Sequence, residues 1–283
     1  MITCDSKPPR DVPPESTLCR RLCGHGDTPA RTSLAGVSVD PLAPLMDLPG
    51  VREAVARARD AVTVAHRHPA NRRSWPATAA EASVRAARAS AALDGGNPEL
   101  PGDGSVRDPV LAGALRVAEA LGGMLSTWRR APLQALARLH VLAAADLLPG
   151  PQLGRPDSSR GSTARLDGLA SLVTGGSQVA APVLVAVVHG ELLALAPFGQ
   201  GNGVVARAAA RLTMVSSGLD PKGLIVPEVA HLRREGQYRT AAAGFASGEV
   251  AAIGRWLVHC CTALSAGSLE AISIAEAVTV GNN

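Results

Sequence analysis

Aromatic residues are almost missing from this sequence. Its 283 residues include two Phe, one Tyr and three Trp, which together make 2% of the chain. Hydrophobic residues still make up 46%, so the core must be built from Ala, Leu and Val. Because Ala and Leu are strong helix formers, this composition favours a helical protein. A chain of this length can bury a sizeable core, as one large domain or two small ones.

Strong charge and long apolar runs are also absent. The formal net charge is only +4, and no basic tract carries interleaved aromatics, so nothing specific supports nucleic-acid binding. The most apolar window, residues 179–195, is interrupted by Pro182, His189, Gly190 and Glu191, whereas a membrane-spanning helix needs about 20 apolar residues. No apolar run of the signal-peptide type follows the first charges. We therefore expect a cytoplasmic protein with neither nucleic acid nor a membrane as partner.

The cysteine pattern does not indicate a disulfide framework, because the number is odd and the positions are scattered. The five residues are Cys4, Cys19, Cys23, Cys260 and Cys261. A zinc site needs four ligands at recognisable spacing, and beside Cys19, Cys23 and His25 only Cys4 lies nearby. We predict no metal site. The pair at 260–261 lies in an apolar segment and is expected to pack in the core.

The chain divides by composition into a tail and a helical body. Residues 1–42 are rich in Pro, Gly, Ser, Thr and charge, so they bury too little apolar surface to offset their ordering entropy and are expected to be disordered. Apolar spacing then predicts roughly nine or ten helices. The expected helices include about 51–66, 77–94, 109–127, 132–147, 163–173, 182–195 and 202–215, with loops at 69–76, 95–108 and 148–162. We divide the body into N-terminal helices (43–125), a core (126–265) and a C-terminal helix or tail (266–283).

The most informative stretch runs from Leu195 to Arg207 and reads LAPFGQGNGVVAR. Pro197 ends the preceding helix, because proline has no N–H to donate. Glycines surround Asn202, where a new helix is expected to begin. Such glycines let backbone N–H groups converge, and a helix start has N–H groups without partners in the helix. The stretch therefore predicts an anion site, most simply for phosphate, with Arg207 about one turn into the helix.

This stretch resembles the signature loop of Fic (Fido-domain) proteins, His-Pro-Phe-x-(Asp/Glu)-Gly-Asn-Gly-Arg-x-x-Arg. The matching residues are Pro197, Phe198, Gly201, Asn202, Gly203 and Arg207. The histidine, the acidic residue and the first arginine of the pattern are replaced by Ala196, Gln200 and Val204. The resemblance implies a mainly α, Fic/Fido-type helical bundle. We expect this bundle to carry at most a short, reduced version of the family's β-hairpin flap, because residues 148–162 lack alternating apolar residues.

A second resemblance lies upstream, in Ser90-Ala-Ala-Leu-Asp94-Gly95. It is similar to the end of the inhibitory helix of many Fic proteins, Ser/Thr-x-x-x-Glu-Gly/Asn. In that family the glutamate pairs with the last arginine of the loop, which corresponds to Arg207. We therefore expect an Asp94–Arg207 ion pair and give Ser90, Asp94 and Gly95 a regulatory role. The alternative is that the pair only pins one helix to another.

The resemblance also implies a chemistry, the transfer of AMP from ATP to Ser, Thr or Tyr hydroxyls. Ala196 cannot take a proton as a general base. Gln200 offers Mg²⁺ only a neutral carbonyl, and Mg²⁺ prefers carboxylates, so Mg²⁺ is not expected to bind in the family's way. We assign no catalytic residue. The candidate phosphate- or nucleotide-binding residues are Gly199, Gln200, Gly201, Asn202, Gly203 and Arg207, with ATP or another nucleotide as ligand.

Two histidines also match the family loosely. His140 follows a leucine as in an early helix of the family, and His189 lies seven residues before Ala196. We predict packing or capping roles for both. Three functions remain open: a catalytically degenerate protein that still binds nucleotide or phosphate; an active nucleotidyl or phosphoryl transferase with relocated catalytic groups; or a non-catalytic scaffold for an unidentified protein partner.

Overall fold

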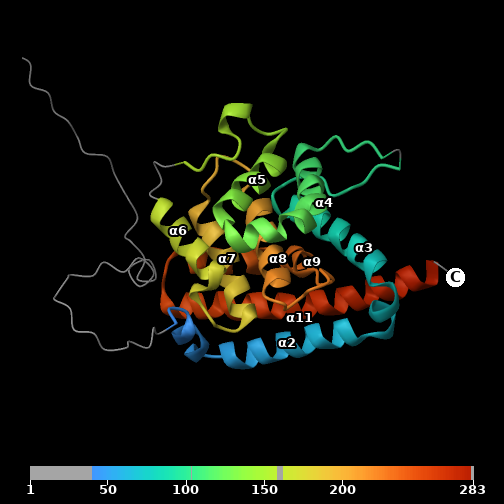
Figure 1. Ribbon diagram of the computed structural model, residues 1–283. Helices are drawn as coiled ribbons and strands as arrows, with labels where there is room; N and C mark the ends of the chain where they lie inside the picture. The colour runs from blue at the N-terminus through green and yellow to red at the C-terminus, as the bar shows by residue number, and fades with distance from the viewer. Residues whose placement is uncertain (1–39, 103, 158–161, 282–283) are drawn as a thin grey trace, which may run out of the picture.

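The computed structural model describes residues 40–102, 104–157 and 162–281, so the tail expected at 1–39 lies outside the described part. The described residues form ten α-helices and no β-strand (Figure 1). The helices are α2 (Val51–Arg67), α3 (Pro69–Leu93), α4 (Pro109–Arg130), α5 (Pro132–Ala144), α6 (Thr163–Ser171), α7 (Ala181–Leu195), α8 (Asn202–Ser216), α9 (Pro227–Arg233), α10 (Glu235–Ala246) and α11 (Val250–Gly281). This confirms the predicted mainly α class.

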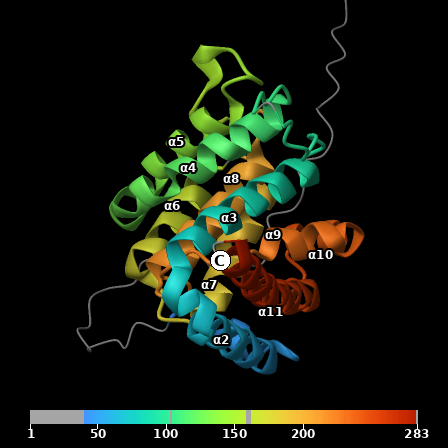
Figure 2. The same cartoon turned by 90° about the vertical axis from the view of Figure 1, so that its right-hand side faces the viewer.

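Helices α7 and α8 form the centre of the bundle. Both are short helices of 15 residues in which most residues are buried. One apolar core lies between them and α2 and α11, and a second lies between them and α4, α5 and α6. Figure 2 shows α4 and α5 on one side of the pair and α2 and α11 on the other. The loop that joins α7 to α8 is therefore fixed by buried helices at both ends.

The longest helix, α11, supports the central pair from below in Figure 1 and lies along α2. It also packs on α3, α7, α9 and α10. Trp256 on α11 is fully buried and donates from its indole N–H to the backbone oxygen of Ala186 on α7, at 2.8 Å. Buried indole N–H groups usually find such a partner, and this contact joins α11 to α7.

On the side of α7 and α8 opposite to α2 and α11, α4 packs closely against α5 (Figure 2). Asp108 caps α4 by accepting from the N–H of Leu111 at 2.8 Å, and Pro109 takes the first helical position, where no N–H is required. Gly113 faces the backbone of Ala143, and any side chain at this position would collide with the Ala143 carbonyl. Because Gly113 has no side chain, α5, which carries His140, can lie close against α4.

Two expectations from the sequence were wrong at helix starts. Residues 69–76 are not a loop but the first turns of α3, in which only Ser74 leaves helical geometry, at φ −120° and ψ 26°. Pro69 occupies the first position of the helix, and the kink at Ser74 accommodates Pro76. The tail does not reach residue 42, because Leu42 is fully buried and the Asp40 carboxylate accepts from the backbone N–H of Leu42 at 2.9 Å.

Both boundaries that the sequence analysis drew within the helical body fall inside helices. The boundary at 125/126 falls inside α4, and the one at 265/266 falls inside α11. A long helix can be continuous while its composition changes, since its packing partners change along its length. In the flap region, the described residues 148–157 hold one 3₁₀ turn, Gly150–Gln152, and no strand.

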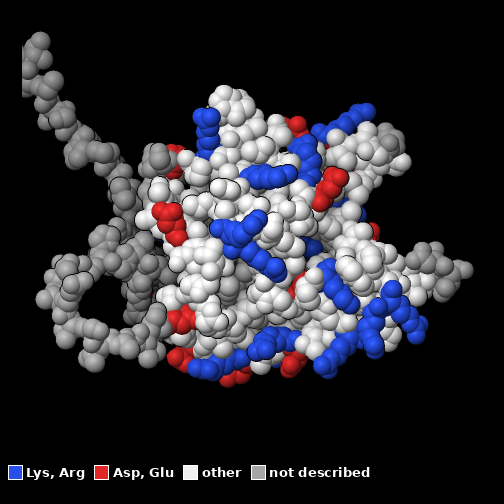
Figure 3. Space-filling view, viewed as in Figure 1, with Lys and Arg blue, Asp and Glu red and all other residues white. Residues whose placement is uncertain are grey.

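Helices α4 and α11 are long and apolar enough to cross a membrane by length and composition alone. The most apolar window of α11 is 50% buried inside the protein and that of α4 is 28% buried. Core helices of globular proteins pass the same test, and both helices pack on several neighbours. Figure 3 shows basic and acidic side chains interspersed over the face that it presents.

Candidate functional site

The loop between α7 and α8 is held in shape by its own asparagine. Helix α7 ends at Leu195, and Ala196 adopts a left-handed conformation at φ 40°, which is uncommon for a residue with a side chain. The Asn202 side chain then spans the loop. Its Oδ1 accepts from the N–H of Phe198 at 2.9 Å, and its Nδ2 donates to the Phe198 oxygen at 2.7 Å.

His140 supports the loop from α5. Its ring stacks on Phe198 with centres 4.0 Å apart. The backbone N–H of Gly154 donates to Nδ1 at 2.9 Å, so the proton lies on Nε2, which donates to the Gln200 oxygen at 3.1 Å. Burial lowers the pKa of His140, although the bond to Gln200 opposes this effect. His140 thus has the packing and capping position predicted for it.

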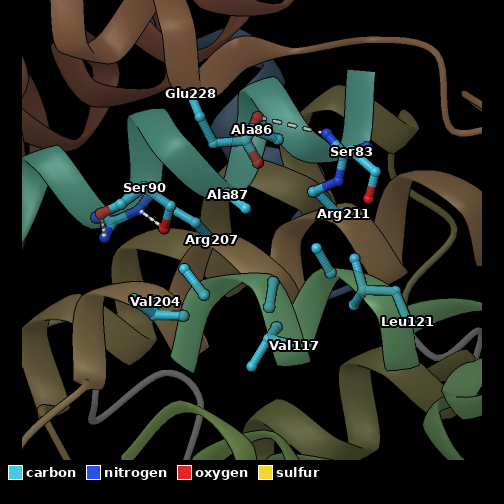
Figure 4. Close-up of a pocket in the computed structure, with 13 residues that line it drawn as sticks. Ser83, Ala86, Ala87, Ser90, Val117, Leu121, Val204, Arg207, Arg211 and Glu228 are labelled. Atoms are coloured by element: carbon cyan, nitrogen blue, oxygen red, sulfur yellow. Dashed lines mark hydrogen bonds and ion pairs between the residues drawn. The ribbon is translucent and has the colours of Figure 1, made fainter. Parts of the chain in front are cut away.

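Arg207 is buried, with only 3% of the residue exposed, and its guanidinium is surrounded by acceptors. Nε donates to the Ser90 hydroxyl at 2.8 Å, and Nη2 donates to the Ser90 backbone oxygen at 2.9 Å and to Asp94 Oδ1 at 2.7 Å. Nη1 lies 3.3 Å from the Tyr238 hydroxyl. Figure 4 shows Arg207 reaching Ser90 across the contact of α8 with α3. The structure therefore brings Ser90, Asp94 and Arg207 together.

The Asp94 carboxylate lies directly over the start of α8. Its second oxygen accepts from the N–H of Val204 at 3.0 Å. Gly203 makes this approach possible, because a Cβ at that position would collide with both carboxylate oxygens. Gly95, at φ 84°, ends α3 immediately after Asp94. The positive end of a helix dipole stabilises a negative group, so the Asp94 carboxylate occupies the place that the sequence predicts for phosphate.

Two hollows lie on either side of Asp94. One, of about 470 Å³, is bounded by the loop residues Gln200, Gly201 and Gly203 and by Ala143 and Leu147 of the α5 end. The other, of about 330 Å³, is bounded by Arg207 and Tyr238 and by α7 and α10. Leu93, Asp94 and Arg239 line both hollows. The end of α3 and the Arg239 side chain therefore form the partition between them.

No protein-family model and no curated protein matches this sequence. Solved structures match it over most of its length. A Fic family protein from Desulfovibrio desulfuricans G20 aligns with a TM-score of 0.65 at 19% identity, over 80% of this chain and 74% of that one. The chain has the Fic fold. A fragment of Fic-1 from C. elegans aligns with a TM-score of 0.59 at 16% identity, over 83% of this chain and 73% of that one. A glutamate-to-glycine variant of the same fragment aligns with a TM-score of 0.60 at 17% identity, over 83% of this chain and 74% of that one.

Within this Fic fold, the three replaced positions of the loop have different surroundings. Ala196 offers only a methyl group. Val204 is 3% exposed and packs in the core shared by α4, α5 and α8, whereas Gln200 is exposed. The carboxylate at the loop is that of Asp94, and its oxygens already bind Arg207 and the N–H of Val204. Because Mg²⁺ prefers carboxylate oxygens that are free to coordinate, the residues present do not fit it.

His189 does not supply the missing base. It is 3% exposed, and its Nε2 lies 2.9 Å from the Tyr238 hydroxyl. Its ring belongs to a buried cluster with His231, Tyr238, Trp256 and His259. Burial, with smaller contributions from Arg207 and His259, lowers the pKa of His189 to about 3. His189 is therefore neutral and has the structural position predicted for it.

Arg239 is the residue at the site that sequence reasoning missed. Its Nη2 donates to the Leu93 backbone oxygen at 2.8 Å, and its Nε donates to Glu235 at 2.7 Å. Its side chain is 60% exposed, and it places a cation, paired with Glu235, in the lining of both hollows. No motif marks this residue, and its place follows only from the way α10 packs against the end of α3.

We predict strong energetic coupling between Asp94 and Arg207. In a double-mutant cycle with Asp94→Asn and Arg207→Gln, the coupling in the free energy of unfolding should be about 1–3 kcal/mol, because each single variant leaves its partner poorly satisfied. Urea denaturation of the four proteins measures it. Asp146 and Arg116 form a matched control pair, also at 2.7 Å but 49% and 35% exposed, for which about 0–1 kcal/mol is expected. Equal coupling in the two pairs would contradict the account.

We also predict that stability falls as pH is lowered from 7 to 5. Burial lowers the pKa of His189 to about 3 and that of His231 well below its ordinary value, whereas both titrate near 6.5 when unfolded. Below that pH the unfolded chain binds protons that the folded chain does not. Each histidine then removes up to about 1.4 kcal/mol of stability per pH unit. Denaturation of wild type and His189→Gln checks this, and the account fails if both lose stability equally.

Proposed function

We propose that this Fic-fold protein binds a nucleotide through its phosphates at the start of α8, that Asp94 competes for the same place, and that the protein does not transfer the nucleotide by Fic chemistry. The observation that carries the proposal is the Asp94 carboxylate, which accepts from both the N–H of Val204 and Nη2 of Arg207. An anionic group thus already occupies a site built from a helix start and a buried cation.

Electrostatics favours phosphate at this position. The first N–H groups of a helix and its dipole together attract anions, which is why phosphates bind at helix starts. Arg207 is held in place by Ser90 and Tyr238 as well as by Asp94. If Asp94 withdraws, a phosphate oxygen can take over both of its hydrogen bonds while Ser90 keeps the guanidinium oriented.

The surroundings of Asp94 allow such an exchange. Its side chain is 23% exposed, and it is the last residue before Gly95, so it can move without unwinding α3. The hollows beside it, about 470 and 330 Å³, are within the range of small-molecule sites, which is about 300–1,000 Å³. Arg239, which lines both hollows, adds a second cation that is paired with Glu235.

The absence of a base argues against transfer. General base catalysis contributes about 10²–10⁴-fold to a rate, and Ala196 cannot supply it. Neither of the two nearby histidines is available to replace it. Both ring nitrogens of His140 contact backbone groups, and His189 is buried against Tyr238. These contacts support a protein that binds nucleotide without passing it on.

We expect nucleotide binding to appear or strengthen when the competing carboxylate is removed. Calorimetry with ATP, ADP and AMP should give an affinity for Asp94→Gly at least about 10-fold higher than for wild type, which corresponds to about 1.4 kcal/mol. Adding Arg207→Ala to Asp94→Gly should reverse the gain. Asp146→Gly, which removes an exposed aspartate elsewhere, is the control and should behave as wild type. Omitting Mg²⁺ should change the affinities little.

The other two functions give different results. If folded Asp94→Gly, checked by circular dichroism, binds no nucleotide, the proposal is wrong and a scaffold that binds a protein partner becomes the favoured function. Transfer of label from radioactive ATP to the protein or to added proteins would instead indicate an active transferase. We expect no transfer from either wild type or Asp94→Gly.

A further inference from the structure

A third hollow lies away from the loop, between the first half of α3, α4 and α8. Its volume is about 360 Å³, and residues of the turn that follows α8 also line it. It shares no lining residue with the two hollows beside Asp94. Ser83, Leu121 and Arg211 are among its lining residues, and Figure 4 shows these three at the contact of α3, α4 and α8. This hollow, which we call the Trp75 pocket, therefore differs in its lining from the two hollows beside Asp94.

The walls of the Trp75 pocket are mostly apolar. They include Leu121 and Leu125 of α4, Leu212 and Val215 of α8, and the indole of Trp75 on α3. Trp75 is 41% exposed, whereas Trp128 and Trp256 are fully buried. A large aromatic surface left open beside a concave apolar wall gains free energy when a ligand removes it from water.

The charges at the Trp75 pocket are all positive. The charged residues that line it are Arg211 and Lys222, and no Asp or Glu lines it. The guanidinium of Arg211 is engaged with the backbone oxygens of Gly223 and Ile225 and with Glu228. Lys222 holds its ammonium 5.8 Å from the centre of the Trp75 ring and, within the part of the chain that the structure describes, forms no ion pair. Its charge is therefore available at the mouth of the pocket.

We propose that the Trp75 pocket binds a small amphipathic anion, with an apolar chain or ring between α4 and α8 and a carboxylate at Lys222. The volume falls within the range of small-molecule sites. The apolar walls select an apolar body, and the ammonium selects a negative head group over a positive one. The pocket shares no lining residue with the two hollows beside Asp94.

The position of the tryptophans provides a direct test with the full chain. Octanoate, kept below its micellar concentration, is titrated while tryptophan fluorescence is recorded, with 1-octanol and octylammonium as neutral and cationic probes of the same chain length. Octanoate should give a saturable change in wild type and none in Trp75→Phe, because the remaining two indoles are buried. Lys222→Gln should weaken octanoate binding at least 10-fold and leave 1-octanol binding unchanged. Arg239→Gln, at the other site, should bind octanoate like wild type.

Three results would overturn the proposal: no saturable change with octanoate in wild type, equal affinity for all three probes, or unchanged octanoate affinity in Lys222→Gln. Lys222 lies in a surface turn, so its replacement leaves the core intact, and circular dichroism verifies this. Calorimetry of octanoate binding provides a readout that does not depend on Trp75. Failure here leaves nucleotide binding at Asp94 untouched, so the two proposals are tested separately.

Discussion

A single buried guanidinium links three helices of this bundle. A buried charge is costly unless other groups pair with it, so buried charges are found with partners. Arg207 of α8 is almost completely buried. Its partners come from the end of α3, through Ser90 and Asp94, and from α10, through Tyr238. Tyr238 in turn contacts His189 on α7. The need to satisfy one charge therefore fixes how α3, α7, α8 and α10 meet.

The same contact places a carboxylate over the start of α8. The proposed function therefore sets stability and ligand binding in competition, because the group that compensates Arg207 also covers the N–H of Val204. Ser90 and Tyr238 would still contact the Arg207 guanidinium if Asp94 moved away. In the proposed function a phosphate replaces the Asp94 carboxylate as the remaining partner of Arg207, so that one anion exchanges for another. The proposed exchange does not require a histidine at position 196, since binding and proton transfer rely on different groups.

Much of this arrangement could be predicted from the sequence. Two short patterns, one around Asp94 and one around Asn202, are about 110 residues apart, yet together they predict the fold and the Asp94–Arg207 pair. They do so through their resemblance to two motifs of Fic proteins, whose glutamate and last arginine form a pair in that family. The helices at 109–127 and 182–195 could be predicted because caps and apolar spacing are local properties.

The missed features depend on packing between distant segments. Pro76 reads as a helix breaker, but a kink at Ser74 lets α3 continue. Nothing near Leu42 shows that it is buried, because its partners lie elsewhere in the fold. Arg239 and Trp75 gain their places from neighbours contributed by other helices. Such residues carry no motif, and only the assembled bundle reveals them.

The most direct test of the central claim is a crystal structure of Asp94→Gly grown with ATP. The account predicts a phosphate oxygen within hydrogen-bond distance of the N–H of Val204 and of Nη2 of Arg207, with the loop from Ala196 to Gly203 unchanged. A nucleotide bound elsewhere, or a start of α8 that holds only water while the loop keeps its shape, would contradict it.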